Sequence, residues 1–433
     1  MNKFNSAAER TLNNHSEDGV DRRGFLKCMS WAGAGLVWTF SSGVPFSRLF
    51  GATPPRGKGD FSFVQISDSH IGFDKPANAD VTATLQSAIG KMNALPVEPD
   101  LILHTGDISH LAKPGEFDTF DQVAKSSRTK NIFYVPGEHD VATDNGQQYM
   151  ERYGKDSKGA GWHSFDHKGV HFIGLVNVVD LKAGGLGTLG RDQLEWLEGD
   201  VKRLSASTPL VVFAHIPLWA VYPQWGWGTQ DSAQALSYLK KFGSVTVLNG
   251  HIHQIMQKVE GNVAFHTAMA TAFPQPVPGT APSAGPLKVP ANELRSVLGI
   301  TDVNYVAGGH HLAVVDAPLA GTAPEESTAI LRKAAAALPA AAPANGAAAG
   351  GALAQVGIDN FDYSPKELTV KAGSTVQWTN KDDSPHTVTA DDAAFGSPVL
   401  DTNQKFQFTF AKAGRYSYHC KLHPSMTAVV VVH

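Results

Sequence analysis

Short apolar runs alternate with amphipathic segments over the first large part of the chain, from residue 60 to residue 318. The apolar runs are rich in Val, Ile, Leu and Phe, which predicts buried strands at Phe61–Ile66, Leu101–His104, Ile132–Val135, Leu210–Phe213 and Val245–Leu248. Helical spacing of apolar positions predicts helices at Val81–Leu95, Gln193–Leu204 and Ser232–Phe242. Antiparallel hairpins are expected at His163–Val176 and Ile255–His266. Strands and helices mixed in this way predict an α/β sandwich.

The pattern changes twice toward the C-terminus. Alanine and proline dominate residues 319–354, which predicts a linker, although Glu325–Leu338 could form a helix because alanine has the highest helix propensity. Residues 355–433 then show short β-rich runs separated by turn residues, at Val356–Phe361, Leu368–Val370, Thr375–Trp378, Phe406–Phe410, Tyr416–His419 and Ala428–Val432. Evenly spaced strands of this kind predict a small, all-β sandwich domain.

Composition agrees with an ordinary globular protein of two or three domains. The chain has 433 residues, of which 42% are hydrophobic and 18% charged. The net charge of −4 argues against a nucleic acid or an anionic membrane as partner. No apolar stretch in the body of the chain reaches the length of a transmembrane helix, so we expect no stable membrane insertion.

The first 52 residues predict an export signal. Arg22-Arg23, followed by Phe25-Leu26-Lys27 and a mostly apolar run to Phe40, resembles a twin-arginine signal. That resemblance implies transport of a folded protein to the periplasm. The exported protein would keep one of its two cysteines, Cys420, and therefore no internal disulfide.

Five clusters of potential metal ligands end or follow the predicted strands. They are Asp68-Ser69-His70, Gly106-Asp107, Gly137-Glu138-His139-Asp140, His215 and Gly250-His251-Ile252-His253. Side chains just beyond the carboxyl ends of neighbouring buried strands converge in one crevice. In an extended chain, residues two apart point to the same side, which pairs the first residue with the third in the first cluster. Imidazole and carboxylate together suit zinc, iron or manganese, so the sequence predicts a metal centre here.

The order of these clusters resembles the calcineurin-like metallophosphoesterase superfamily, and the stretch 63–140 is most similar to its cyclic-nucleotide phosphodiesterase branch. The superfamily motifs are Asp-x-His, Gly-Asp, Gly-Asn-His-Asp/Glu, Gly-His and Gly-His-x-His. The resemblance implies two mixed β-sheets flanked by helices. It also implies one metal ion held by Asp68, His70, Asp107 and His253 and a second held by Asp107, Glu138, His215 and His251.

In such a site a pair of cations clamps a phosphoryl group and activates a water molecule. The resemblance implies that His139 contacts the phosphoryl oxygen or protonates the leaving group, and that Asp140 orients His139. The fourth motif departs slightly from the family pattern, because Ala214 takes the place of its glycine.

The third motif departs from the family pattern more seriously. The usual asparagine is Glu138, so the site would carry three carboxylates instead of two. A third carboxylate should bind cations more tightly and suit a more highly charged iron, but it weakens the metals as Lewis acids and repels an anionic phosphate ester. Alternatively, Glu138 simply replaces the oxygen donor, and both readings stay open at the level of the sequence.

The C-terminal segment carries a second set of ligands. His386 is followed by Tyr418-His419-Cys420-Lys421-Leu422-His423-Pro424-Ser425-Met426, and two histidines, one cysteine and one methionine are the ligands of a blue-copper site. Together with Asn380 and Ser384-Pro385, these pieces resemble the cupredoxins of the amicyanin and plastocyanin group. The resemblance implies a trigonal set of His386, Cys420 and His423, with Met426 as a weak axial ligand and His419 facing away.

Two functions are consistent with this organisation. The first is an exported phosphoesterase that hydrolyses phosphate mono- or diesters at a dinuclear centre of Fe, Mn or Zn, with an appended type 1 copper domain for electron transfer or redox control. The alternative is a copper or electron-transfer protein whose phosphoesterase-like domain is a non-hydrolytic metal-binding scaffold. Glu138 favours the alternative, whereas the nearly complete motif set, with His139 and Asp140, favours the first. A phosphate ester and a redox protein are the expected partners.

Overall fold

The computed structural model describes residues 38–41, 44–47, 57–179, 181, 186–281, 283–307, 311–321, 324–338, 353–423 and 425–433. The chain divides into two units at residue 52, and the first unit contains a short antiparallel pair, β1 (Trp38–Ser41) and β2 (Val44–Ser47). The expected export signal, with Arg22-Arg23, lies outside the described residues apart from this pair. Residues 339–352 of the expected linker also lie outside them, so both stay predictions.

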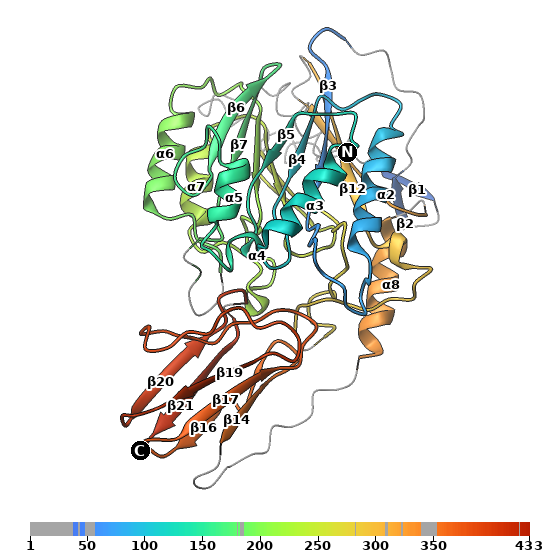
Figure 1. Ribbon diagram of the computed structural model, residues 1–433. Coiled ribbons are helices and arrows are strands. Elements are labelled where there is room, and N and C mark those ends of the chain that lie inside the picture. Colours follow the sequence, from blue (N-terminus) through green and yellow to red (C-terminus); the bar gives the residue numbers. More distant parts are fainter. Residues whose placement is uncertain are drawn as a thin grey trace, which may run out of the picture. The chain divides into compact units, whose positions relative to one another are not determined.

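Two mixed sheets form the middle of the N-terminal domain (Figure 1). The strand order of the six-stranded sheet is β10-β11-β9-β8-β7-β6, and that of the five-stranded sheet is β13-β12-β3-β4-β5. The strands are β3 (Phe61–Ile66), β4 (Leu101–His104), β5 (Ile132–Tyr134), β6 (His163–His167), β7 (Val170–Gly174), β8 (Leu210–Ala214), β9 (Val245–Asn249), β10 (Gln257–Glu260), β11 (Val263–Thr267), β12 (Gly299–Val306) and β13 (His311–Pro318). Within them, β3, β4 and β5 are parallel neighbours, as are β7, β8 and β9.

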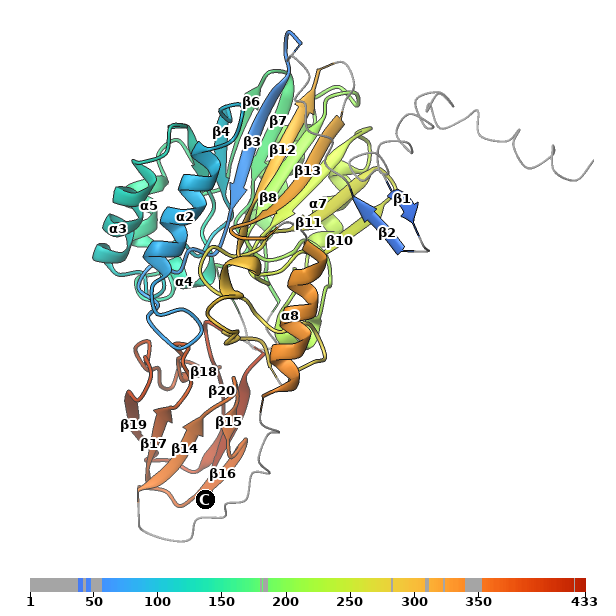
Figure 2. The ribbon, with the colours of Figure 1, turned by 90° about the vertical axis from the view of Figure 1, so that its right-hand side faces the viewer.

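Helices cover the outer face of each sheet (Figures 1 and 2). The helices α2 (Val81–Asn93), α3 (Pro114–Ala124) and α5 (Gln147–Tyr153) pack on the five-stranded sheet, and α6 (Arg191–Val201) and α7 (Ser232–Leu239) pack on the six-stranded sheet. The remaining helical segments of the described residues are α4 (Glu138–Val141), α8 (Pro324–Ala336) and two short 3₁₀ turns, η1 (Pro223–Trp225) and η2 (Leu294–Ser296). The predicted α/β sandwich is therefore confirmed.

Strand β3 shows why apolar residues occupy both faces of the strands in this domain. Phe61 and Phe63 face the second sheet and pack against Phe172 of β7, whereas Val64 and Ile66 on the opposite face pack in the cluster under α2. Because a strand alternates its side chains between two faces, and both faces are buried here, every position can be apolar.

Some elements were not predicted from the sequence. Strand β12 was not predicted because Asp302 and Asn304 interrupt its apolar pattern on the less buried face.

The helix expected at 325–338 is present as α8. Its Leu331 packs in a small cluster with Val289 and Val297, so this part of the alanine-rich segment joins the core of the N-terminal domain.

The C-terminal domain is a sandwich of two four-stranded sheets, which confirms the all-β prediction. One sheet has the order β15-β14-β17-β19 and the other β16-β21-β20-β18. The strands are β14 (Ala354–Ile358), β15 (Tyr363–Ser364), β16 (Glu367–Val370), β17 (Thr375–Asn380), β18 (Thr389–Ala390), β19 (Lys405–Thr409), β20 (Gly414–His419) and β21 (Thr427–Val432). Trp378, Tyr418 and Cys420 are buried in the core between the sheets.

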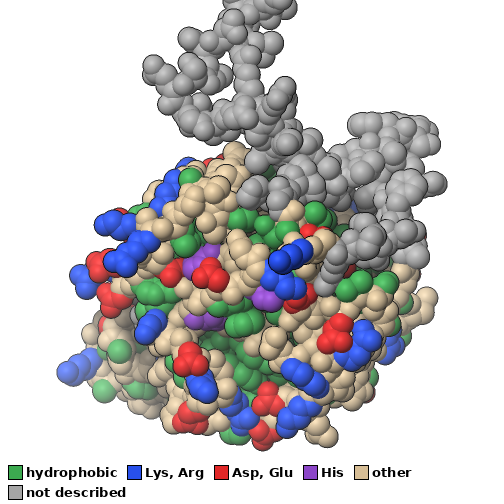
Figure 3. Space-filling view, turned by 90° about the horizontal axis from the view of Figure 1, so that it is seen from above, with side chains coloured by type: hydrophobic (Ala, Val, Ile, Leu, Met, Phe, Trp, Pro, Cys, Tyr) green, Lys and Arg blue, Asp and Glu red, His purple; other side chains and the backbone are tan. Residues whose placement is uncertain are grey.

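Charged side chains of both signs share one face of the molecule. On the face drawn in Figure 3, lysine and arginine side chains are interspersed with aspartate and glutamate. None of the helices in the described part of the chain combines the length and hydrophobicity that a membrane crossing requires.

Candidate metal centres

The seven predicted ligands of the first centre lie beyond the carboxyl ends of five strands. Asp68 and His70 follow β3, Asp107 follows β4, His215 directly follows β8, and the His251–His253 segment follows β9. The seventh ligand, Glu138, is the first residue of α4, in the connection after β5. Parallel strands bring their carboxyl ends to one edge of a sheet, so the topology itself gathers these side chains.

The backbone is left-handed at five of these seven ligands. The φ angles are 52° at Asp68, 39° at His70, 54° at Asp107, 70° at His251 and 54° at His253. This conformation is costly for a residue with a side chain, on the order of 1–3 kcal/mol each, and it persists only where the surroundings enforce it. Here the Asp68 amide donates to the carbonyl of Gly106 (3.0 Å) and the His70 amide to the carbonyl of Asp107 (2.8 Å). The fold therefore fixes the ligand directions.

Two motif glycines are required because of close approach. A Cβ atom on Gly137 would lie 2.0 Å from Oδ1 of Asp107, and one on Gly250 would lie 2.1 Å from Oγ of Ser67 and 2.7 Å from Oδ2 of Asp68. Any side chain at either position would push a ligand carboxylate out of place. The glycines of the third and fifth motifs therefore make room for the ligands.

The ligand atoms form two groups that share one carboxylate oxygen. In the first group, Nε2 of His70 lies 3.4 Å from Oδ2 of Asp107, and Nε2 of His253 lies 3.2 Å from Oδ1 of Asp68. In the second group, Nε2 of His215 lies 3.3 Å from the same Oδ2 of Asp107. Asp107 is thus placed to bridge two cations.

Glu138 completes the second group with both of its oxygens. Oε2 lies 3.0 Å from Nε2 of His215, and Oε1 lies 2.9 Å from Nδ1 of His251. In the family pattern an asparagine donates one oxygen at this position. Glutamate has a longer side chain, and Glu138 reaches both histidines with its two oxygens. The structure gives this group one more negative charge than the family pattern has.

The donor set fits metal ions. Oε2 of Glu138 and Nε2 of His215 are buried and make no hydrogen bond of acceptable geometry among the described residues, although they lie 3.0 Å apart. Two polar atoms lie close together without a hydrogen bond between them when both point at a common centre, as the ligands of one metal ion do. The other nitrogen of His215 donates to the carbonyl of Thr105 (2.7 Å), and Nδ1 of His253 donates to that of Phe273 (2.6 Å). Each imidazole is thereby held with Nε2 free for a cation.

The lowered pKa values of two buried carboxylates show that the first centre favours a positive charge. Burial alone would raise the pKa of Asp68, but the imidazoles of His253 and His215 bring it down to about 2. Burial likewise opposes ionisation of Glu138, and His251 and His215 hold its pKa well below the usual value. These carboxylates are therefore ionised at neutral pH and need a cationic partner, which a metal ion supplies without protons.

His139 lies beside the bridging carboxylate, but Asp140 does not orient it as expected. The His139 amide donates to Oδ1 of Asp107 (3.0 Å), and Nδ1 of its ring donates to the carbonyl of His110 (2.8 Å). The carboxylate of Asp140 accepts instead from the amides of Ile108, Ser109 and Gly137 and from the Ser109 hydroxyl. Asp140 thus joins the loops after β4 and β5, and burial together with Asp107 raises its pKa to about 7.

His110 is a member of the site that the sequence reasoning missed. Its Nδ1 lies 3.3 Å from Nδ1 of His70, and its ring stacks on that of His139 with 5.0 Å between centroids. Ligand atoms of these three histidines all lie within 4.8 Å of one another. Its position three residues after Asp107, in the same loop beyond β4, was the available signal.

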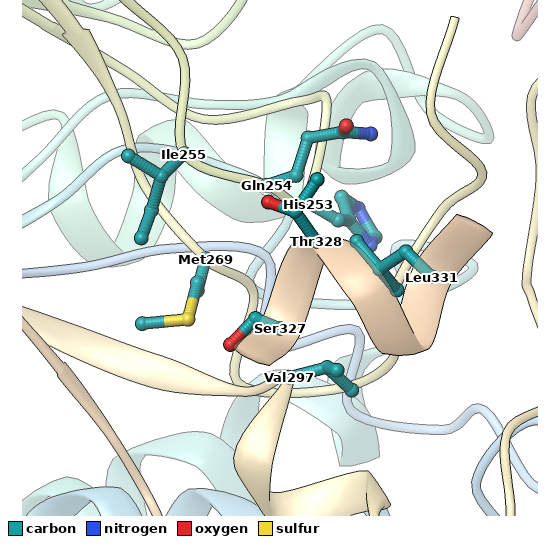
Figure 4. Close-up of a pocket in the computed structure, with 8 residues that line it drawn as sticks. All are labelled: His253, Gln254, Ile255, Met269, Val297, Ser327, Thr328 and Leu331. Carbon is teal, nitrogen blue, oxygen red and sulfur yellow. The ribbon is translucent and has the colours of Figure 1, made fainter. Parts of the chain in front are cut away.

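His253 also lines a small pocket (Figure 4). Its lining comes from the segment around His253, from Met269 and Val297, and from Ser327, Thr328 and Leu331 of α8. Helix α8 therefore supports the back of the fifth motif.

The second centre lies at one end of the C-terminal sandwich, where three ligand atoms surround a common point. Nδ1 of His386 lies 3.7 Å and Nδ1 of His423 lies 3.8 Å from Sγ of Cys420, and the two nitrogens are 3.2 Å apart. These separations suit one small cation with soft and imidazole ligands. Met426 is buried beside them, and the Met426 amide donates to the carbonyl of His423 (2.9 Å), which closes the loop. His419 is not part of the group and contacts Asp391 (2.7 Å).

Two further residues support the second centre and were not predicted. The Thr387 amide donates to Sγ of Cys420 (3.3 Å), which stabilises a thiolate. Asp382 accepts from Nε2 of His386 (2.8 Å), which leaves Nδ1 for the metal. Burial would lower the pKa of His386, but Asp382 and Cys420 raise it to about 9, so metal binding must displace a proton there.

We expect Gly137→Ala to weaken metal binding at the first centre by about 10–100-fold, since the new methyl group collides with Asp107. The φ of −96° at Gly137 suits alanine, so the collision alone is tested. Calorimetric titration of the metal-free protein with Mn²⁺ measures the effect. Gly199→Ala in α6 is the matched control, since its Cβ would meet nothing within 4 Å. If both variants bind Mn²⁺ with wild-type affinity, the expected collision between a methyl group at position 137 and Asp107 is contradicted.

We expect Asp382→Asn to lower copper affinity by about 10–100-fold, because an amide can donate to Nε2 of His386 and so favour the wrong tautomer. Copper titration against a competing chelator measures the change. Asp383→Asn changes the exposed neighbour and should leave the affinity unaltered. An equal loss in both variants would show a general charge effect and not a tautomer effect.

Known proteins match the two parts of the chain separately. The calcineurin-like phosphoesterase family matches residues 61–255, and the cupredoxin-like domain family matches residues 330–432. The 3′,5′-cyclic-nucleotide phosphodiesterase alr5338 of Nostoc sp. is 27% identical over 220 residues, which are 49% of this chain and 79% of that protein.

The C-terminal domain is similar to amicyanins. Amicyanin of Paracoccus denitrificans is 40% identical over 82 residues, 18% of this chain, and the chain spans 63% of its length. Amicyanin-alpha of Methylorubrum extorquens is 35% identical over 83 residues, which cover 18% of this chain and 70% of that protein. The chain thus combines a calcineurin-like phosphoesterase domain with a C-terminal domain that belongs to the cupredoxin family.

Proposed function

We propose that the protein is a metal-dependent phosphoesterase that hydrolyses phosphate mono- or diesters at a dinuclear centre, with a copper site in its cupredoxin domain for electron transfer or redox control. One observation carries the proposal. Oδ2 of Asp107 lies within 3.4 Å of His70 and within 3.3 Å of His215, so two complete ligand groups share one carboxylate. A bridged pair of cations polarises a phosphoryl group and lowers the pKa of water.

The chain itself would supply proton transfer through His139. Its Nδ1 donates to a carbonyl, so Nε2 is the free ring atom and donates only when the ring is an imidazolium. Stacking on the His110 ring and the amide bond to Asp107 fix the ring beside the metal ligands. His139 is therefore positioned to protonate a leaving oxygen that the metal site holds in place.

The similarity to a cyclic-nucleotide phosphodiesterase over 220 residues supports a diester as substrate. Iron is the metal we favour at the dinuclear centre, because Glu138 adds a third carboxylate and harder, more highly charged cations prefer carboxylate oxygens. A redox-active metal also gives a reason for a copper domain in the same chain.

Hydrolysis of a simple phosphodiester and a phosphomonoester tests the proposal. The purified protein loaded with Mn or Fe should turn over at least one of them, and His139→Ala should reduce kcat by about 10²–10⁴-fold, since a proton donor is lost. His167→Ala is the control, because this histidine contacts Asp100 away from the ligands. An inactive wild-type protein with both metals bound would refute the phosphoesterase.

A second candidate function follows from the two contacts of Glu138. If its extra charge suppresses hydrolysis, the domain is a metal-binding scaffold and the copper domain carries the activity. Glu138→Asn would then gain hydrolysis over an inactive parent. In the favoured case the parent is active, and the same variant has weaker metal affinity without such a gain.

A further inference from the structure

The two candidate centres meet through a pair of histidines. The ring of His423, a ligand of the copper site, lies 6.0 Å from the ring of His139 between centroids, with the planes at 66°. His423 directs Nδ1 toward Cys420 and His386, so the opposite edge of its ring remains for other contacts. His139 is 4% exposed, although it belongs to a site that must admit a substrate.

Three segments of the phosphoesterase domain contact the cupredoxin domain around this pair. Nζ of Lys75, in the loop after β3, lies 3.6 Å from Oδ1 of Asp401. Ala142, at the end of α4, packs against the hydrophobic core cluster of the cupredoxin domain. A Cβ on Gly285 would lie 2.1 Å from the ring of Phe361, so this ring lies directly on the backbone there.

Phe361 connects that contact to the copper ligands. Its ring meets His423 edge-on at 4.7 Å and His386 at 5.1 Å between centroids. The contacts therefore do not fall at random on the cupredoxin surface. They lie at the end of the sandwich that carries the copper ligands, and two of the three contacting residues on the other domain, Lys75 and Ala142, follow the first and third motifs.

We propose that the cupredoxin domain docks with its copper ligand His423 against the phosphoesterase site, so that His139 and His423 join the two metal centres within one chain. The proposal deepens the proposed function, since it makes the dinuclear site the intrachain partner of the copper site. His423 then contacts the phosphoesterase domain of the same chain. No separate carrier protein is needed between the two centres.

Carbodiimide coupling of the metal-loaded full chain tests the docking without any mutation. The reagent joins an ammonium and a carboxylate that are in contact, so peptides holding Lys75 and Asp401 should be found linked by mass spectrometry. The pair Lys168 and Asp100, within the phosphoesterase domain, is the positive control. Appearance of the control product without the Lys75–Asp401 product would overturn the proposal.

Electron paramagnetic resonance of Cu(II) tests whether the two centres are close. With Mn²⁺ in the phosphoesterase domain, the copper signal should relax faster than with diamagnetic Zn²⁺. Lys75→Glu faces Asp401 with a like charge and should remove most of this enhancement, and the exchange Lys75→Glu with Asp401→Lys should restore it. Equal relaxation with Mn²⁺ and Zn²⁺ in the wild-type protein would refute the contact.

Neither readout depends on hydrolysis. A linked, magnetically coupled protein without turnover would refute the proposed phosphoesterase and keep the docking. An active enzyme with no link and no coupling would do the reverse.

Discussion

The carboxylate of Asp107 is the interaction on which the first centre depends. One oxygen faces His70 and His215, from the two ligand groups, and the other accepts the His139 amide. Its backbone has a φ of 54°, and Gly137 packs so closely that any side chain there would displace it. Each ligand group takes residues from both sheets, since those after β3, β4 and β5 belong to one sheet and those after β8 and β9 to the other. The site therefore exists only while the two sheets stay packed together.

In the second centre, hydrogen bonds to the ligands are the main constraint. Its ligands come from loops at one end of a small sandwich, and hydrogen bonds set their chemistry. The Thr387 amide stabilises a thiolate at Cys420, and Asp382 fixes the tautomer of His386. A rigid β framework with preset ligands changes little when a bound ion changes charge, which suits electron transfer. Docking of this end on the phosphoesterase site would bring the proposed copper centre beside the proposed dinuclear centre.

Much of this architecture could be predicted from the sequence, because periodicity and motif order are local signals. Strands buried on both faces, such as β8, gave continuous apolar runs, and the five clusters gave the ligand residues that the structure brings together. Three features could not be predicted in this way. Strand β12 carries polar residues on its less buried face, His110 has no motif partner in the sequence, and the role of Asp140 depends on which amides surround its carboxylate.

Metal counting by native mass spectrometry tests the central claim most directly, namely that one carboxylate joins two metal sites in a chain that holds a third. The metal-loaded wild-type chain should carry three ions, two in the phosphoesterase domain and one copper, and Asp107→Ala should keep only the copper. A variant that retains two ions besides copper, or a wild-type protein that binds a single ion in its phosphoesterase domain, would contradict the account.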